Sequence, residues 1–99
     1  MARHYWTDAA TRDLNDVYDY LADRDPGAAE RLIDEFDRKA DLYAGNPLLG
    51  EAHFDLVAEL RAFRVRSYVV FYRPYRDGIA IARIVHSARD LPRLFSAEP

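Results

Sequence analysis

The chain has 99 residues and a net charge of −3, with 49% hydrophobic and 13% aromatic residues. This composition supplies enough apolar surface for one core, and we predict a single domain over residues 1–99. The sequence contains no cysteine, which excludes disulfides, cysteine nucleophiles and cysteine-based metal sites. No apolar run approaches the roughly 18 residues that a membrane span needs, and the N-terminus does not resemble a signal peptide. We therefore predict a cytoplasmic protein with no membrane partner.

The charges are unevenly distributed along the chain. Residues 1–57 carry 6 basic and 13 acidic side chains, whereas residues 58–99 carry 8 basic and 4 acidic ones. Thirteen of the basic side chains are arginines, and Lys39 is the single lysine. The second half can therefore present a basic surface, but the overall acidity argues against tight, non-specific binding to nucleic acid.

The first half of the chain predicts a short strand followed by a helical hairpin. Residues 3–6 are rich in aromatics and form a candidate edge strand. Thr7 can cap a first helix over about 8–24, and Asp25-Pro26 restarts a second helix that ends near Gly45. Apolar residues recur at helical spacing in both segments, while the acidic residues lie off these stripes. The acidic residues are therefore interpreted as a solvated face.

The second half of the chain predicts a loop followed by three strands. Pro47 and Gly50 are turn residues within the loop, which spans residues 46–57. β-Branched and aromatic residues then dominate three runs. These runs lie at residues 61–66, 68–72 and 79–86.

Two tight turns connect the three runs. The first is at Arg66-Ser67, and the second covers residues 74–78, where Asp77-Gly78 is the strongest turn signal. Beyond the last run, residues 89–95 predict a short terminal helix. The order β-α-α-β-β-β predicts an α+β fold, in which the helical hairpin packs on one face of a small, mostly antiparallel sheet.

Short motifs occur in a characteristic order from Tyr5 to about Leu94. They are Trp6-Thr7 before an acidic helix, Tyr18 with Leu21, Asp25-Pro26, Pro47-x-x-Gly50, Leu60-Arg61-x-Phe63, Tyr68-Val69-Val70-Phe71-Tyr72-Arg73 and Ile79-x-Ile81-x-Arg83-Ile84-Val85-His86-x-Ala88-Arg89-Asp90. Together they resemble the RelE/ParE superfamily of toxins from type II toxin–antitoxin systems. The resemblance implies a toxin that a co-expressed antitoxin holds inactive.

The resemblance leaves two activities open. RelE-like members cleave mRNA on the ribosome without metal, whereas ParE-like members lack that catalytic set and poison DNA gyrase. Cleavage by a 2′-hydroxyl requires a proton acceptor, a proton donor and cations for the developing charge. Arg61, Arg64 and Arg83 could clamp a phosphate, but arginine, with a pKa above about 12, cannot act as the base. His86 is then the candidate acid or base, with Tyr68 or Tyr72 as helpers.

Each of these residues also has a structural interpretation. His86 can be a strand-end histidine that is hydrogen-bonded to the turn at Arg89-Asp90, where the two charges form a local ion pair. Strand alternation places Arg83 on the same side as Ile79, Ile81 and Val85, so we predict a partly buried arginine. Such an arginine needs a carboxylate partner, either within the chain or on the antitoxin.

The overall acidity decides between the two activities, because ribosome binding demands a strongly positive molecule. We predict a ParE-like toxin that blocks DNA gyrase, is not itself a catalyst, needs no cofactor or metal, and does not bind DNA without its antitoxin. A RelE-like ribosome-dependent mRNA endoribonuclease is the first alternative, and a non-toxic antitoxin-binding module is the second. The predicted toxin and partner surface consists of Arg61, Arg64, Arg83, His86, Arg89 and Asp90.

Overall fold

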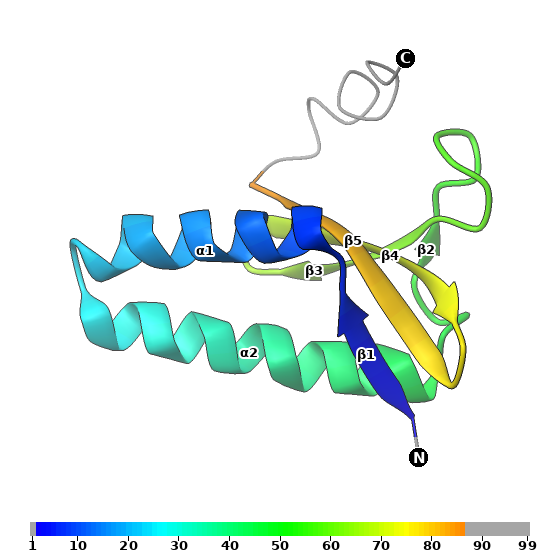
Figure 1. The fold of residues 1–99 in the computed structure, drawn as a ribbon, viewed down its shortest axis with the longest axis horizontal. Coiled ribbons are helices and arrows are strands. Elements are labelled where there is room, and N and C mark those ends of the chain that lie inside the picture. The colour runs from blue at the N-terminus through cyan, green and yellow to red at the C-terminus, as the bar shows by residue number, and fades with distance from the viewer. Residues whose placement is uncertain (1, 87–99) are drawn as a thin grey trace.

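Two antiparallel helices cover one face of a twisted sheet (Figure 1). The computed structural model describes residues 2–86. The helices are α1 (Asp8–Ala22) and α2 (Pro26–Gly45), and the strands are β1 (Arg3–Trp6), β2 (Glu51–Ala52), β3 (Arg61–Val65), β4 (Tyr68–Tyr75) and β5 (Gly78–Val85). The predicted α+β fold, with the helical hairpin on one face of the sheet, is confirmed.

The sheet has the strand order β1-β5-β4-β3-β2. Strands β2 to β5 pair antiparallel in sequence, and β1 joins the outer edge of β5 in parallel. The predicted edge position of residues 3–6 is therefore correct. Strand β2 lies inside the segment 46–57, which was predicted to be a loop. Its two residues pair with Ala62 and Arg61, and two residues are too few for an alternating pattern to reveal a strand in the sequence.

Side-chain caps define where the helices begin. The Thr7 Oγ1 accepts a hydrogen bond from the Ala10 amide at 3.2 Å and donates to the Ile81 carbonyl at 2.9 Å. Thr7 therefore both starts α1 and ties it to β5. Asp25 caps α2 in the same way, accepting from the Ala28 amide at 3.1 Å. The first helix ends at Ala22, two residues before the predicted boundary.

Strand β4 runs through Pro74, where the sequence predicted a turn. Pro74 pairs with Ile79 on β5, whereas the pairing of β4 with β3 stops at Tyr72. Among residues 2–86 the outer side of β4 has no strand partner beyond Tyr72, so the missing amide of proline costs no ladder hydrogen bond there. The turn itself is reduced to Arg76 and Asp77, and its left-handed residue is Arg76, with φ 51°, rather than Gly78.

Most of the core lies between the helices and the sheet. Its buried members from α2 include Leu32 and Phe36, which pack against Val65, Val70 and Ile81. The predicted apolar stripes thus face the sheet, and Tyr68 and Tyr72, four residues apart on β4, share the helix-covered face. A smaller cluster lies on the opposite face of the sheet and contains Leu60, Ala62, Val69 and Phe71.

The buried phenol of Tyr72 fastens the segment after α2 to the sheet. Its hydroxyl donates to the Pro47 carbonyl at 2.8 Å and accepts from the Gly50 amide at 2.9 Å. Burial raises the pKa of Tyr72 above its ordinary value, although the Gly50 hydrogen bond and the Arg61 charge act in the opposite direction. A neutral phenol is therefore part of the folded structure.

Tyr72→Phe is expected to lower the free energy of unfolding by about 1–3 kcal/mol, because the Gly50 amide and the Pro47 carbonyl lose their partner. Stability should also fall above about pH 10, where an unfolded tyrosine releases its proton before the folded one does. The folded pKa is the higher one, so this contribution is complete below pH 10 and is lost as the pH rises through the folded value. Urea unfolding at pH 7 and at pH 10–11 measures both effects. The free energy of unfolding should fall less between these pH values in Tyr72→Phe than in the wild type. An equal alkaline loss in both proteins would contradict the assignment.

Candidate functional site

Arg83, a predicted phosphate clamp, is bound to a carboxylate of α1. Its Nε and Nη2 donate to the two oxygens of Asp13 at 2.7 and 3.1 Å, and the Ile84 amide donates to the same carboxylate at 2.9 Å. The side chains of Arg83 and Asp13 are 32% and 15% exposed. The predicted acidic partner of Arg83 is therefore internal, and the interpretation of the acidic residues as a solvated face fails for Asp13.

A bulge in β5 explains the position of Arg83. Phe71 pairs with Arg83 but Tyr72 pairs with Ile81, so Ala82 has no residue opposite. The extra residue reverses the alternation. Arg83 consequently shares the side of Val85 but not that of Ile79 and Ile81, and the predicted grouping of all four residues is wrong.

Arg61 holds the segment between α2 and β2. Its Nη1 donates to the carbonyls of Leu48 and Gly50 at 3.1 and 3.0 Å, and its guanidinium lies 5.1 Å from the ring centroid of Phe54. Arginine satisfies several carbonyl groups at once through its planar fork. Within the described part of the chain, this guanidinium therefore has a structural role.

Arg64 and His86 lie on opposite faces of the sheet. Arg64 is exposed and pairs with Val69, which belongs to the cluster on the face away from the helices. The His86 ring instead packs edge-on against Tyr68 at 5.1 Å, on the face that the helices cover. Side chains on opposite faces of a sheet point away from each other, so the fold does not direct these two toward one phosphate.

The predicted catalytic residues are therefore not brought together. The guanidinium groups of Arg61 and Arg83 hold separate parts of the fold, and Arg64 and His86 are separated by the sheet. The predicted residues Arg89 and Asp90, their turn beside His86 and the terminal helix over 89–95 lie outside the described residues. The single lysine, Lys39 on α2, reaches the sheet, where its Nζ donates to the Arg64 carbonyl at 2.8 Å.

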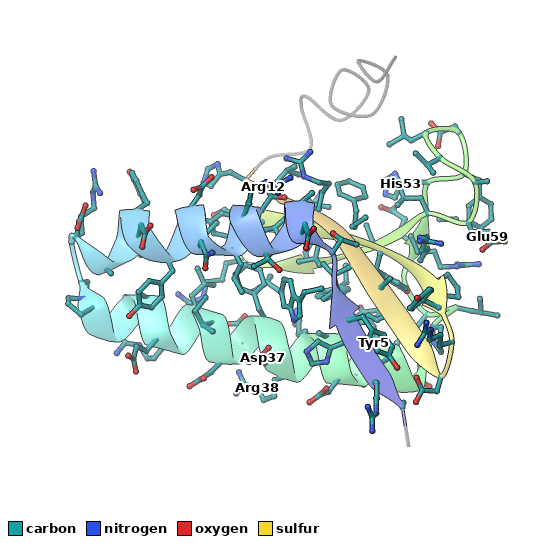
Figure 2. The ribbon with its side chains drawn as sticks, viewed as in Figure 1. Tyr5, Arg12, Asp37, Arg38, His53 and Glu59 are labelled. Atoms are coloured by element: carbon teal, nitrogen blue, oxygen red, sulfur yellow. The ribbon has the colours of Figure 1, made fainter. Side chains whose placement is uncertain are left out.

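A second histidine, which the sequence did not single out, lies beside β2. The His53 Nε2 is 3.2 Å from the Glu51 Oε1, and the ring packs edge-on against Phe71 at 5.5 Å. These two polar residues and Arg64 line a cleft of about 230 Å³. Figure 2 shows His53 on the loop after β2, at the end of the molecule away from the α1–α2 connection. The pairing of Glu51 with Ala62 brings Glu51 and His53 beside β3, and no pattern in the sequence predicts that pairing.

The chain is similar to known proteins both in sequence and in fold. The family model described as "ParE toxin of type II toxin-antitoxin system, parDE" matches residues 5–91. The chain belongs to this family. Membership confirms the resemblance to the RelE/ParE superfamily, and it indicates an antitoxin as the partner of this ParE-family protein.

Relatives carry both family names. The chain is 39% identical to Toxin RelE3 of Caulobacter vibrioides over 79% of this chain and 86% of that protein. It is 29% identical to Toxin ParE1 of Mycobacterium tuberculosis over 93% and 96% of the two chains. A solved structure titled "Chromosomal ParDE TA system from P. aeruginosa" matches with a TM-score of 0.72 at 21% identity, covering 88% of this chain and 97% of that chain. At that identity the match supports the fold alone.

Two further kinds of site, a metal centre and a membrane-spanning helix, are absent from residues 2–86 of this ParE-family chain. In that range no three histidine, aspartate or glutamate side chains converge in a way that could hold a metal ion. Neither α1 nor α2 is long and apolar enough to cross a membrane. Besides the His53 cleft, these residues form an aromatic pocket at His86 and a pocket between α1 and α2 that includes Leu14, Tyr18 and Ile33. His4 also lies beside a carboxylate, with its Nδ1 2.8 Å from the Asp41 Oδ1.

Proposed function

We propose that this protein is a ParE-like toxin that acts in the cytoplasm, blocks DNA gyrase and is neutralised by a cognate antitoxin. The observation that carries the proposal is the dispersal of the predicted catalytic side chains. Phosphodiester cleavage needs an acid, a base and a cation within hydrogen-bond reach of one phosphate. Arg61 and Arg83 instead contact protein groups, and Arg64 and His86 face in opposite directions.

The charge of the molecule supports the same proposal. The pI of about 5.5 and the acidic surface of both helices disfavour tight binding to the ribosome, which is a dense polyanion. A protein target imposes no such requirement, because local charge complementarity is sufficient for specific recognition. We assign the toxin surface to the sheet and the segment after it. Its predicted members are Arg61, Arg64, Arg83, His86, Arg89 and Asp90, of which Arg64 and His86 lie on opposite faces of the sheet and would contact different parts of the target.

Induction of the protein in a plasmid-bearing host tests the proposal directly. We expect arrested growth, altered plasmid supercoiling and DNA breaks, with mRNA ends on ribosomes unchanged. His86→Ala removes one contact of the proposed surface and should not abolish growth inhibition, whereas an enzyme that used His86 as acid or base would lose about 10²–10⁴-fold in rate. Cleaved mRNA with intact DNA metabolism would overturn the gyrase assignment. Growth unaffected by the wild type would instead favour a non-toxic antitoxin-binding module.

A RelE-like endoribonuclease is the second candidate, and the His53 cleft is the observation that favours it. His53 is oriented by a carboxylate and shares its cleft with Arg64, which together supply a titratable group and a cation. His53→Ala separates the candidates, with Glu51→Gln as its companion. Under the gyrase proposal both variants remain fully toxic. Loss of toxicity together with loss of ribosomal mRNA cleavage would establish the nuclease instead.

A further inference from the structure

An aromatic pocket lies where the C-terminal half of α1 faces the ends of β4 and β5. It is lined by Asp16, Val17, Tyr20, Tyr68 and His86, and its volume is about 350 Å³. Three of these five side chains carry aromatic rings. The His86 and Tyr68 rings meet edge to face at 5.1 Å, and Tyr20 is 58% exposed. The pocket therefore presents ring surface to solvent beside a carboxylate.

The molecule already shows that a ring of this pocket accepts a cation. The guanidinium carbon of Arg24 lies 3.9 Å from the centroid of the Tyr20 ring, and its Nη1 donates to the Tyr20 carbonyl at 2.8 Å. Aromatic rings attract cations through the negative potential of their faces, and the attraction grows as the cation leaves water. The phenol of Tyr68 is neutral at physiological pH, as tyrosine ordinarily is. Burial raises its pKa further, with a smaller contribution from Tyr20.

The carboxylate at the rim has no cation within the described residues. Asp16 is exposed and makes neither a hydrogen bond nor an ion pair within residues 2–86, whereas Asp13, one turn earlier, is occupied by Arg83. Acidic residues outnumber basic ones on α1 and just after it. Over residues 8–25 the acidic residues are Asp8, Asp13, Asp16, Asp19, Asp23 and Asp25, and the basic ones are Arg12 and Arg24. The field at the pocket thus favours a positively charged ligand.

We propose that this pocket binds an arginine or lysine side chain of the antitoxin. The charged group would pair with Asp16 and lie against the rings of Tyr20 and Tyr68, while its apolar stem would contact Val17. The inference rests on the proposed function for the presence of an antitoxin. The chemistry of the pocket selects the basic side chain.

The first experiment uses the full-length protein and a small probe. N-acetyl-arginine amide, titrated by NMR, is expected to shift the Val17 methyl and the Tyr20 and Tyr68 ring signals, whereas N-acetyl-leucine amide is not. Asp16→Asn should weaken the arginine probe about tenfold. Asp19→Asn removes the same charge from the same helix outside the pocket, and it should change the affinity for the arginine probe by less than about twofold. Equal effects of the two variants, or no shift in the wild type, would overturn the inference.

The second experiment uses the antitoxin encoded beside this chain. Its affinity for the toxin is expected to fall about tenfold with Asp16→Asn and to remain nearly unchanged with Asp19→Asn. An antitoxin that binds Asp16→Asn as tightly as the wild type would overturn the inference and leave the proposed function standing. If the protein encoded beside this chain does not bind the wild type at all, both the inference and the proposed function would be overturned.

A third variant tests whether the chain fills the pocket with its own basic residues. The double substitution R89A/R93A removes the two arginines that follow His86 in the sequence. We expect it to bind the arginine probe with unchanged affinity. Binding several-fold tighter than that of the wild type would assign the pocket to these arginines and overturn the proposal of an antitoxin side chain.

Discussion

Asp13→Ala is expected to lower the free energy of unfolding by about 2–4 kcal/mol, although Asp13 looks like one more acidic residue on a surface helix. The carboxylate accepts three hydrogen bonds, two from Arg83 and one from the Ile84 amide. The substitution takes the Asp13 carboxylate away from a partly buried guanidinium and removes the side-chain acceptor of the Ile84 amide. Strand β1 pairs with β5 only as far as Ile81, so α1 closes the edge beyond that point.

Urea unfolding followed by circular dichroism measures this effect. Asp13→Asn keeps an acceptor for the Ile84 amide and should lose less stability than Asp13→Ala. Asp16→Ala is the matched control, because Asp16 lies on the same helix without an ion pair within residues 2–86, and it should change stability by less than about 0.5 kcal/mol. A double-mutant cycle with Arg83→Met should give a clear coupling energy. Equal losses for Asp13→Ala and Asp16→Ala would show that the Asp13 contacts contribute nothing.

Gly50→Ala is expected to destabilise the protein by about 2–4 kcal/mol. The backbone of Gly50 is not left-handed, so the requirement for glycine is one of space. A methyl group there would overlap the Tyr72 hydroxyl and lie 2.7 Å from the Tyr72 Cε1. The ring cannot move aside at low cost, because it is buried and its hydroxyl is held by Pro47 and Gly50.

Gly45→Ala provides the matched control for this prediction. Gly45 is the last residue of α2, and a methyl group there meets nothing within 4 Å. Alanine at this position should leave stability unchanged or raise it by about 0.5–1 kcal/mol, because it favours the helix. In thermal unfolding, the melting temperature should therefore fall for Gly50→Ala and stay the same or rise for Gly45→Ala. A Gly50→Ala protein as stable as the wild type would show that the Tyr72 contact can relax freely.

The arrangement of the elements could be predicted from the sequence because each one depends on local patterns. Helical spacing marked α1 and α2, Thr7 and Asp25 marked where they begin, and β-branched runs marked β3 to β5. The order of these elements and their motifs also sufficed to recognise the toxin family. These signals are short-range, so no three-dimensional information was needed.

The candidate site depended on contacts between residues that are distant in the chain. Asp13 and Arg83 are 70 residues apart, and the bulge at Ala82 that brings them together leaves no pattern in the sequence. Glu51 and His53 meet Arg64 only because a two-residue strand pairs with β3.

By itself, then, the sequence determined the α+β fold, the toxin family and the chemical character of the side chains. The tertiary structure alone decided which arginines are engaged by the fold and placed carboxylates beside His4 and His53. The physical reason is that side-chain partners are set by strand register and helix packing, where a shift of one residue reverses the face on which a side chain lies.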